Sequence, residues 1–513
     1  MEFLNKRATS KYPDLATLSE IYHELFHKEE IQPDGWAGDD KTRPLLLLLA
    51  VLSKVQERAE TERRGREVRR EEWQESLELA GYYWHLQHKL GKGLREGINN
   101  VPSTDLENIA KLLEKNREKM RSSLGLEMVG VSVSELHHRE DEGQVAVSGT
   151  KVRSLTAHTP DYVITVQESH RAVVFTVLGT RVFPTPNPGD VIMDLACRTE
   201  TFLDGEAHAG MVLGHRNLVK TALPTLIEEL RRRPGFSLLV VGYSLGAALA
   251  QLFLLDLQAG DLKGRLPAGV EVRGLLFGIP PVYAGNISPL ENVLMISNHN
   301  DGITGASLKA LKDVMIKTRA IHSLNLQRRV LCKMVLNIEG PEEDENQTKA
   351  TTAVTKGVNL KKSFMRKTTS SLNNIVNKQL GTSDDQWSLV EDAVNNVQLS
   401  SLPELRFVGN NLLVLKRTSS KEELGVSLVS GLEELREMTR EVRLKTGMIN
   451  DHMPWAYNKI FSGYNLQNTA VFLILILSGL GSPDVAKNIS LGALDRKLHP
   501  HSLYPDLSTL INS

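Results

Sequence analysis

The feature that most constrains the fold is the stretch 238–251, LLVVGYSLGAALAQ. Residues 238–241 are consecutive branched apolar residues, which is typical of a strand that is buried on both faces. Residues 247–255 are typical of a helix packed against such a strand. Ser244 therefore falls on the turn where the strand gives way to the helix.

Two glycines flank this serine at positions that a sharp turn would crowd. Gly242 and Gly246 lie two residues before and two residues after Ser244, where bulky side chains would not fit. Such a turn pushes the serine hydroxyl off the end of the sheet. It also leaves the backbone amide of Leu245 at a helix N-terminus, where it faces developing negative charge.

Short β-branched segments separated by turns continue on both sides of this stretch. Because helices lie between several of them, they predict a mostly parallel sheet that is covered on both faces. The predicted strands are YVITVQ (162–167), AVVFTVLGT (172–180), VRGLLFG (272–278), NVLMIS (292–297) and NLLVL (411–415).

The sequence predicts three regions around this sheet. Residues 1–125 form a helical N-terminal region, since the stretch 54–121 is rich in Glu, Arg, Lys and Leu and has apolar residues at helical spacing. Residues 126–475 form the domain with the sheet, and 476–513 form a C-terminal extension. Within the domain, residues 339–401 turn to Asn, Ser, Thr, Lys and Glu, so we expect a long mobile insertion there.

Charge and cysteine content restrict the partners and the compartment. The chain has 61 basic and 62 acidic residues, which does not indicate a nucleic-acid surface. Cys197 and Cys332 are its two cysteines, so we expect a reducing, cytoplasmic compartment. The start, MEFLNKRATSKYPDL, lacks the apolar core of a signal peptide.

Two apolar runs, 44–52 and 470–480, resemble pieces of a membrane span. Each has about half the length that a spanning helix needs. We therefore expect buried core elements, and contact with a membrane surface stays open.

A serine hydroxyl needs a general base, and that base needs an orienting carboxylate. Asp301 follows the predicted strand 292–297, at the edge where the active sites of open parallel sheets collect. His322, His452 and His501 are the histidines to weigh as the base. Position favours His452, which follows the strand 411–415, but it excludes neither of the others.

Several motifs, in this order, resemble the class 3 lipases, the fungal-lipase-like branch of the α/β-hydrolases, with a pattern nearest to the diacylglycerol lipases. They are AVVFTVLGT, EAHAGM, GYSLGAAL, LLFGIPPVYAGN and NDHMPWAY. The resemblance spans about residues 162–457, interrupted by the insertion. It implies an α/β-hydrolase fold, with a helical N-terminal region and a long insertion before the last catalytic strand.

The resemblance also implies an activity and the residues that perform it. Ser244 would be the nucleophile, Asp301 the orienting acid and His452 the general base, while the amides of Thr180 and Leu245 would form the oxyanion hole. The chain would be a serine hydrolase that cleaves carboxylic esters of lipids, without a cofactor. The strand RFVGNNLLVL is similar to the family strand before the histidine.

Other positions match or depart from the family pattern. His208 and Asp194 match structural positions. Leu178, Tyr243 and Ala247 replace an arginine, a histidine and a glycine of the family. The stretch after residue 180 has no room for a lid helix, so we expect the insertion to cover the site. The alternative function is a lipase-like scaffold that is catalytically weak or inactive and acts in protein interaction or signalling.

A second motif belongs to another enzyme class. Residues His23 to His27 spell HExxH, which on a helix can hold zinc. Because no third ligand follows at a familiar spacing, we expect an amphipathic helix with exposed histidines and no metal site. Metal analysis of the purified protein would decide between the two.

Overall fold

A computed structural model describes residues 42–59, 66–99, 126–132, 144–147, 150–153, 160–180, 199–286, 288–324, 383–417, 424–445 and 447–461, with some single positions between them. These residues divide into two compact units. The smaller unit takes its residues from Met1–Arg63, Lys312–Ser400 and Arg443–Thr446. The larger unit takes them from Arg64–Leu311, Ser401–Val442 and Gly447–Ser513.

The smaller unit contains helices α3 (Thr42–Ala59) and α12 (Ser383–Asn395) and most of α9 (Leu308–Ser323). In α3, residues 47–52 are at most 3% exposed, so the described part of the apolar run 44–52 is a buried core element as expected. Arg58 Nε lies 2.7 Å from Glu391 Oε1 and joins α3 to α12. Within the described ranges, no helix is both long and apolar enough to cross a membrane.

The larger unit is built on an eleven-stranded sheet in the order β1-β14-β13-β12-β10-β9-β6-β5-β2-β4-β3. Strands β6, β9, β10, β12 and β13 are neighbours and run parallel, and antiparallel strands flank them on both sides. The strand bounds are β1 Arg66–Val68, β2 Leu126–Ser132, β3 Gln144–Val147, β4 Thr150–Arg153, β5 Tyr162–Gln167, β6 Ala172–Val177, β9 Ser237–Tyr243, β10 Val272–Phe277, β12 Leu290–Asn298, β13 Gly409–Arg417 and β14 Leu424–Ser430.

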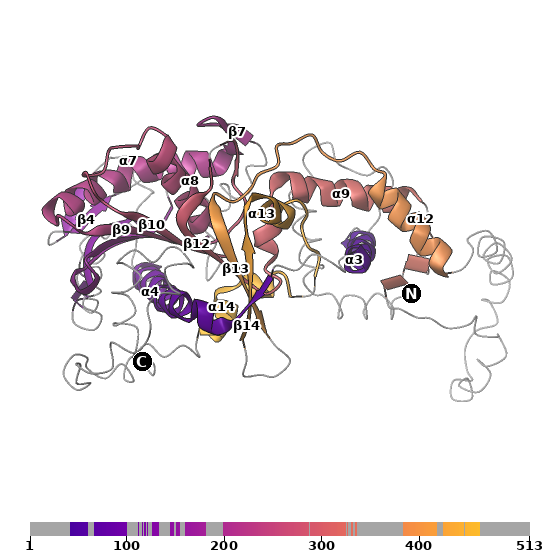
Figure 1. Cartoon of the computed structure of the whole chain (residues 1–513), viewed down its shortest axis with the longest axis horizontal. Helices are drawn as coiled ribbons and strands as arrows, with labels where there is room; N and C mark the ends of the chain where they lie inside the picture. The colour runs from indigo at the N-terminus through magenta and orange to yellow at the C-terminus, as the bar shows by residue number, and fades with distance from the viewer. Residues whose placement is uncertain are drawn as a thin grey trace. The chain divides into compact units, whose positions relative to one another are not determined.

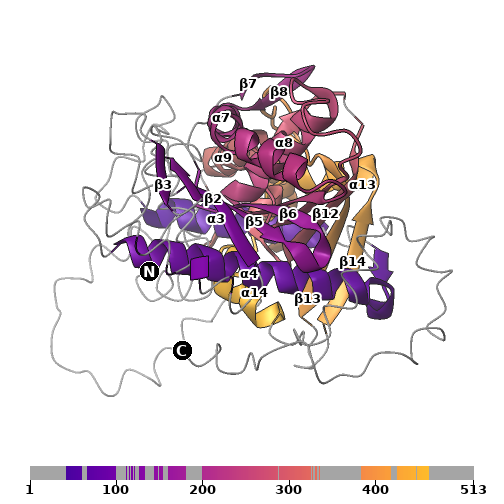
Figure 2. The same ribbon diagram turned by 90° about the vertical axis from the view of Figure 1, so that its left-hand side faces the viewer.

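Helices cover both faces of this sheet, as the unbroken apolar strands require. In Figure 2, α7 (Ala209–Arg232) and α8 (Leu245–Ala259) lie on one face, and α4 (Gln74–Asn99) and α14 (Pro454–Phe461) lie on the other. Alternate side chains of each strand therefore enter different cores. Val240 of β9 packs with α7 and α8, whereas Val241 packs with α4 and α14. This arrangement confirms the expected α/β-hydrolase fold (Figure 1).

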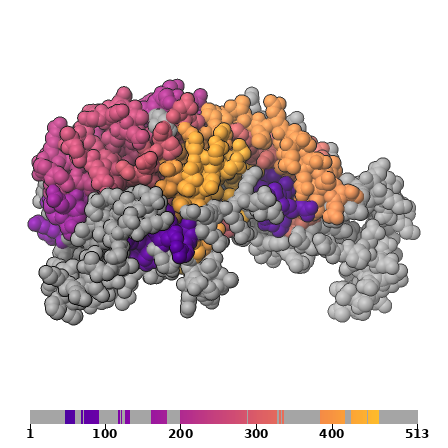
Figure 3. Space-filling model, viewed as in Figure 1, coloured from indigo at the N-terminus to yellow at the C-terminus, as the bar shows by residue number. Residues whose placement is uncertain are grey.

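The remaining elements are short. A second sheet has the order β11-β8-β7. The space-filling view in Figure 3 shows the magenta region that contains α7 at the surface of the molecule. The bounds are β7 Thr199–Phe202, β8 Gly205–His208, β11 Tyr283–Ala284, α13 Leu432–Thr439, and the 3₁₀ helices η1 Arg70–Trp73, η3 Glu168–His170, η4 Gly302–Gly305 and η6 Asn450–His452.

The six predicted strands are all present, but five strands of the large sheet were not expected. These are β1, β2, β3, β4 and β14. The helical N-terminal region contributes α4, which belongs to the same compact unit as the sheet. The division of the chain at residues 125 and 475 stays a prediction.

Several expectations fall wholly or partly outside the described residues. The predicted insertion 339–401 is described from residue 383 onward, where it contains helix α12. The apolar run 470–480, the extension 476–513 and the HExxH motif lie outside the described residues. Cys197, Cys332 and Asp194 also lie outside them.

Candidate active site

Ser244 occupies the turn between β9 and α8, and its backbone has φ 56° and ψ −124°. A non-glycine residue with positive φ is strained, and such strain concentrates at functional sites. The turn is held on both sides. Ser244 N donates a hydrogen bond of 3.0 Å to Phe277 O, and Ser244 O accepts one of 3.0 Å from Ala248 N. The serine therefore has the strained backbone that the sequence predicts.

The two glycines beside the serine are required by close backbone contacts. A Cβ atom on Gly242 would lie 2.6 Å from Gly246 O, and a Cβ atom on Gly246 would lie 2.2 Å from Val177 O. Neither backbone atom can move without opening the turn. The glycine pattern thus follows from the contact of the turn with itself and with the end of β6.

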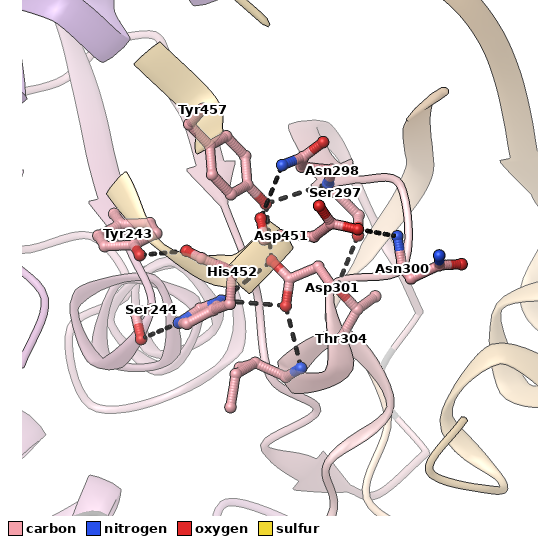
Figure 4. A network of polar contacts seen from close by, with 11 residues as sticks. Tyr243, Ser244, Ser297, Asn298, Asn300, Asp301, Thr304, Asp451, His452 and Tyr457 are labelled. Atoms are coloured by element: carbon pink, nitrogen blue, oxygen red, sulfur yellow. Dashed lines mark hydrogen bonds and ion pairs between the residues drawn. The ribbon is translucent and has the colours of Figure 1, made fainter. Parts of the chain in front are cut away.

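The structure brings the three predicted catalytic side chains together (Figure 4). The distance from Ser244 Oγ to His452 Nε2 is 2.8 Å, and His452 Nδ1 lies 3.0 Å from each carboxylate oxygen of Asp301. Asp301 lies in the turn just after β12, and His452 ends η6, so all three lie at the carboxyl edge of the parallel strands. This chain of contacts can carry a proton from the serine to the imidazole while the carboxylate fixes the ring.

Asp301 is enclosed by hydrogen-bond donors. Its side chain is 0% exposed, so its oxygens depend on partners within the protein. Ile303 N donates to Oδ1 at 2.9 Å, and the Tyr457 hydroxyl donates to Oδ2 at 2.8 Å. Together with His452, these donors replace the water that the carboxylate loses on burial.

The loop that carries His452 is anchored to the end of β12. Asn298 Nδ2 donates to Asp451 O at 2.7 Å, and Asn300 N donates to Asp451 Oδ2 at 3.3 Å. The Tyr243 hydroxyl donates to the backbone oxygen of His452. The Tyr243 ring also stacks on the imidazole, with 5.2 Å between ring centroids and 21° between planes. The imidazole is therefore held by its ring face as well as by its two nitrogens.

Both tyrosines of this network remain neutral. Burial raises the pKa of Tyr243 and of Tyr457 well above 10, and the nearby charge of Asp301 adds to the effect. Their hydroxyls therefore stay protonated and can donate hydrogen bonds throughout the neutral range. They act as fixed donors and not as acids.

The predicted oxyanion-hole residues lie on two segments that meet at the turn of Ser244. Leu245 is the first residue of α8, and Thr180 ends the described segment after β6. A Cβ atom on Gly179 would lie 2.8 Å from Tyr243 O and 3.3 Å from Ser244 Cβ. The segment before Thr180 is thus packed directly against the serine.

Leu178 occupies the position where the family has an arginine. Its side chain is buried, and it lies 3.4 Å from where a Cβ atom of Gly91 on α4 would be. An apolar side chain suits this position because α4 covers it.

The other candidate residues have different positions. His322 lies in α9, and His501 lies outside the described residues. His208 is buried and precedes α7, in keeping with a structural position. Among the described residues, no group of three or more His, Cys, Asp or Glu side chains could hold a metal ion.

Tyr457, Asn298 and the contacts of Tyr243 were not predicted from the sequence. Tyr457 lies five residues after His452, in the quoted stretch NDHMPWAY, but nothing local indicates that it reaches Asp301. Tyr243 was noted only as a departure from the family pattern. Its position beside the serine was the signal that could have identified it.

Comparison with known proteins agrees with the geometry. Residues 176–307, which are 132 of the 513 residues, match the family model described as Lipase (class 3). This match confirms the resemblance to the class 3 lipases for the segment that holds Ser244, Leu245 and Asp301. His452 lies outside the matched segment. No curated protein matches the sequence.

Solved structures of fungal lipases are similar to parts of the chain. The lipase of Rhizopus microsporus var. chinensis has 19% identity and a TM-score of 0.23, covering 28% of this chain and 50% of that one. The triacylglyceride lipase of Rhizomucor miehei has 16% identity and a TM-score of 0.24, covering 28% and 55%. Lipase II of Rhizopus niveus has 15% identity and a TM-score of 0.27, covering 43% and 74%. This chain thus spans about half the length of the first two.

Proposed function

We propose that this protein is a serine hydrolase that cleaves carboxylic esters of lipids through an acyl-enzyme on Ser244. The observation that carries the proposal is the continuous contact from Ser244 Oγ through His452 to Asp301, at 2.8 Å and 3.0 Å. The strained turn under the serine supports the proposal, and so does the family match over residues 176–307.

In the first half of the reaction, Ser244 Oγ attacks the ester carbonyl carbon while its proton passes to His452 Nε2. The carbonyl oxygen becomes an oxyanion, which the amides of Leu245 and Thr180 stabilise by about 3 kcal/mol each in comparable sites. As the tetrahedral intermediate collapses, His452 gives its proton to the leaving alcohol. The acyl group stays on the serine.

In the second half, water replaces the alcohol. His452 takes a proton from the water while the water oxygen attacks the acyl carbon. When this second tetrahedral intermediate collapses, His452 returns the proton to Ser244 Oγ and the fatty acid leaves. Asp301 keeps the imidazole oriented in both halves and stabilises its charged form. These steps use only side chains and amides of the chain and need no cofactor.

The family resemblance supports an acylglycerol or a phospholipid as the substrate. The substrate and the product acid both have long hydrocarbon chains, which keep them in lipid aggregates or membranes. The protein would therefore work at the surface of such an aggregate or membrane. Peripheral contact with such a surface is part of the proposal.

A fluorophosphonate probe tests the proposed nucleophile, because it reacts with activated serines. We expect the wild-type protein to be labelled and Ser244→Ala to lose the label completely. Ser237→Ala is the matched control, since Ser237 begins the same strand β9, and it should be labelled as the wild type is. A panel of acylglycerols and phospholipids, tested with wild type and Ser244→Ala, then identifies the substrate.

The same experiment separates the enzyme from a catalytically inactive scaffold. A folded wild-type protein that neither reacts with the probe nor hydrolyses any ester of the panel would contradict the proposed function. Circular dichroism of the same samples shows whether the protein is folded.

A further inference from the structure

We propose that Trp84, on helix α4, is a positioning residue for the catalytic His452 and Asp301. Helix α4 is then part of the active site, although it lies outside the segment that matches the lipase family. The inference rests on the proposed function, because that function gives His452 and Asp301 their catalytic roles. The contacts that carry it are geometric.

Trp84 contacts both aromatic rings that hold the catalytic pair. Its ring centroid lies 5.1 Å from that of Tyr243, edge to face at 86°, and 4.7 Å from that of Tyr457, stacked at 28°. Tyr243 in turn stacks on His452, and Tyr457 donates a hydrogen bond to Asp301. One side chain thus supports the base through one tyrosine and the acid through the other.

A polar contact fixes the indole in the plane of its ring. Trp84 Nε1 donates a hydrogen bond of 2.7 Å to Asn458 Oδ1, next to Tyr457 in the chain. Asn458 Nδ2 lies 3.2 Å from His88 Nε2, one turn further along α4. Helix α4 therefore holds the middle of α14, which follows His452, by two side chains as well as by ring packing.

Burial makes these contacts strong constraints. Trp84 is 1% exposed, and its ring also packs on Phe277 and Phe461, at 5.3 Å and 6.3 Å between centroids. Close-packed interiors leave side chains few alternative rotamers. Removing the indole opens a cavity into which both tyrosines can relax. A displacement of a catalytic group by about 1 Å can cost about 100-fold in rate.

The preceding residue offers a matched control on the same helix. Tyr83 is also 1% exposed, and its hydroxyl donates a hydrogen bond of 3.0 Å to Gln167 Oε1, on β5. Its described ring contact is with Tyr82 and not with the rings around the catalytic pair. Truncating Tyr83 removes a buried aromatic side chain of α4 without touching the support of His452.

The kinetic test compares Trp84→Leu with Tyr83→Leu in the full chain. Both substitutions should lower the unfolding midpoint by similar amounts, so activities are compared at a temperature where circular dichroism shows both folded. On a soluble short-chain ester we expect Trp84→Leu to lower kcat about 10- to 100-fold with KM changed less than about threefold. Tyr83→Leu should keep kcat within about threefold. Trp84→Phe, which keeps a ring but not the N–H donor, should be intermediate.

A spectroscopic test reads the geometry without catalysis. The proton on His452 Nδ1 that faces Asp301 should give a downfield proton NMR signal, assigned by its loss in His452→Gln. We expect this signal to broaden or vanish in Trp84→Leu and to persist in Tyr83→Leu. An unchanged NMR signal in Trp84→Leu, or an unchanged kcat where the wild type is active, would overturn the inference. If the leucine variant does not fold, Trp84→Phe is judged in the same way.

The two tests also distinguish this inference from the proposed function. If the wild type hydrolyses no ester but the NMR signal responds to Trp84 as expected, the proposed function fails and the positioning role stands. If the wild type is active and the signal ignores Trp84, the positioning role fails alone.

Discussion

The described residues of the larger unit include two buried histidine–aspartate pairs, and a comparison of the two shows what makes such a pair a candidate for catalysis. His452 Nδ1 lies 3.0 Å from Asp301, and His215 Nε2 lies 2.8 Å from Asp256 Oδ2. The histidine side chains are 10% and 3% exposed. By distance and burial, the pairs are nearly equivalent.

They differ in what the second imidazole nitrogen faces. His452 Nε2 faces the hydroxyl of Ser244 at 2.8 Å. His215 Nδ1 is buried and has no hydrogen-bond partner among the described residues. Asp256 is also bound to the backbone, since its Oδ1 accepts from Leu262 N at 3.2 Å. The second pair thus links α7 to α8 and to the loop that follows α8. Among the described residues, its imidazole contacts no nucleophile that it could deprotonate.

The surroundings explain the difference. His452 ends η6, at the carboxyl edge of the parallel strands, where the strained turn also exposes the serine. His215 lies between helices on one face of the sheet, with the rings of Phe202 and Phe253 at 5.4 Å and 6.3 Å. A histidine–aspartate contact therefore indicates catalysis only where the fold adds a third group at an accessible edge.

The largest effect that we predict is for His452→Ala, which removes the proposed general base. We expect kcat for ester hydrolysis to fall about 10⁴- to 10⁶-fold, as it does in serine hydrolases that lose their general base. The unfolding midpoint should change little by comparison. Steady-state kinetics and thermal unfolding of the same preparation check both parts. A residual kcat within tenfold of the wild type would exclude His452 as the base.

For the pair of His215 and Asp256, we expect a loss of stability with little change in kcat. His215→Ala leaves the buried Asp256 without its side-chain partner, which should lower the free energy of unfolding by about 3 kcal/mol. His215→Gln, which can still donate to Asp256, should recover part of the loss. Urea unfolding measures both variants. The kcat of the folded fraction should stay near the wild-type value, and a large loss of kcat would show that the pairs are coupled.

A glycine beside the proposed catalytic pair of His452 and Asp301 sharpens the comparison further. Gly278 has φ +53°, and a Cβ atom there would lie 2.9 Å from His452 Cε1. Gly278→Ala should lower kcat about tenfold or more, because the imidazole must move. Gly264→Ala is the matched control, since Gly264 has φ +75° with nothing within 4 Å of its Cβ position. Both variants should lose about 1 kcal/mol of stability from backbone strain. Equal kcat values for Gly278→Ala and Gly264→Ala would therefore show that contact with His452 is unimportant.

The central part of this fold was predictable because its signals are local. Each of the strands β5, β6, β9, β10, β12 and β13 has apolar or β-branched residues gathered within a few positions, which predicts a buried strand. The turn at Ser244 is likewise indicated by the two glycines that flank the serine. Asp301 comes shortly after a predicted strand. These features needed no knowledge of the tertiary contacts.

The rest depends on contacts between distant parts of the chain. Strand β1, with the sequence REV, is a strand because it pairs with β14, more than 350 residues away. Position alone left three histidines open as the base, and family resemblance was needed to single out His452. Trp84 carries no local mark of its role, since its partners Tyr243 and Tyr457 come from other elements.

A smaller effect is expected for Tyr243→Phe, which keeps the ring stacked on His452 but removes the hydroxyl that binds the His452 backbone oxygen. The loss of one hydrogen bond is worth about 1 kcal/mol, so kcat should fall about fivefold. Because burial raises the pKa of Tyr243 well above 10, this hydroxyl stays protonated in the folded protein. The ratio of wild-type to variant kcat should therefore be constant from neutral pH up to about pH 10. A ratio that falls within this range would show that Tyr243 ionises there.

The smallest effect concerns a third histidine, His170, for which the described residues provide no carboxylate contact of this kind. Burial lowers the pKa of His170 from 6.5 to about 4, and its Nδ1 lies 3.1 Å from Ser169 Oγ. Between these two values the unfolded chain binds the proton and the folded chain does not. Stability is therefore lost as the pH falls from about 6.5 towards 4. After allowance for the partial exposure of the ring, we expect at most about 1 kcal/mol between pH 7 and pH 5. Urea unfolding at both pH values should show His170→Gln to be less sensitive to acid than the wild type, and equal sensitivity would mean that the burial of this ring does not disfavour its charge.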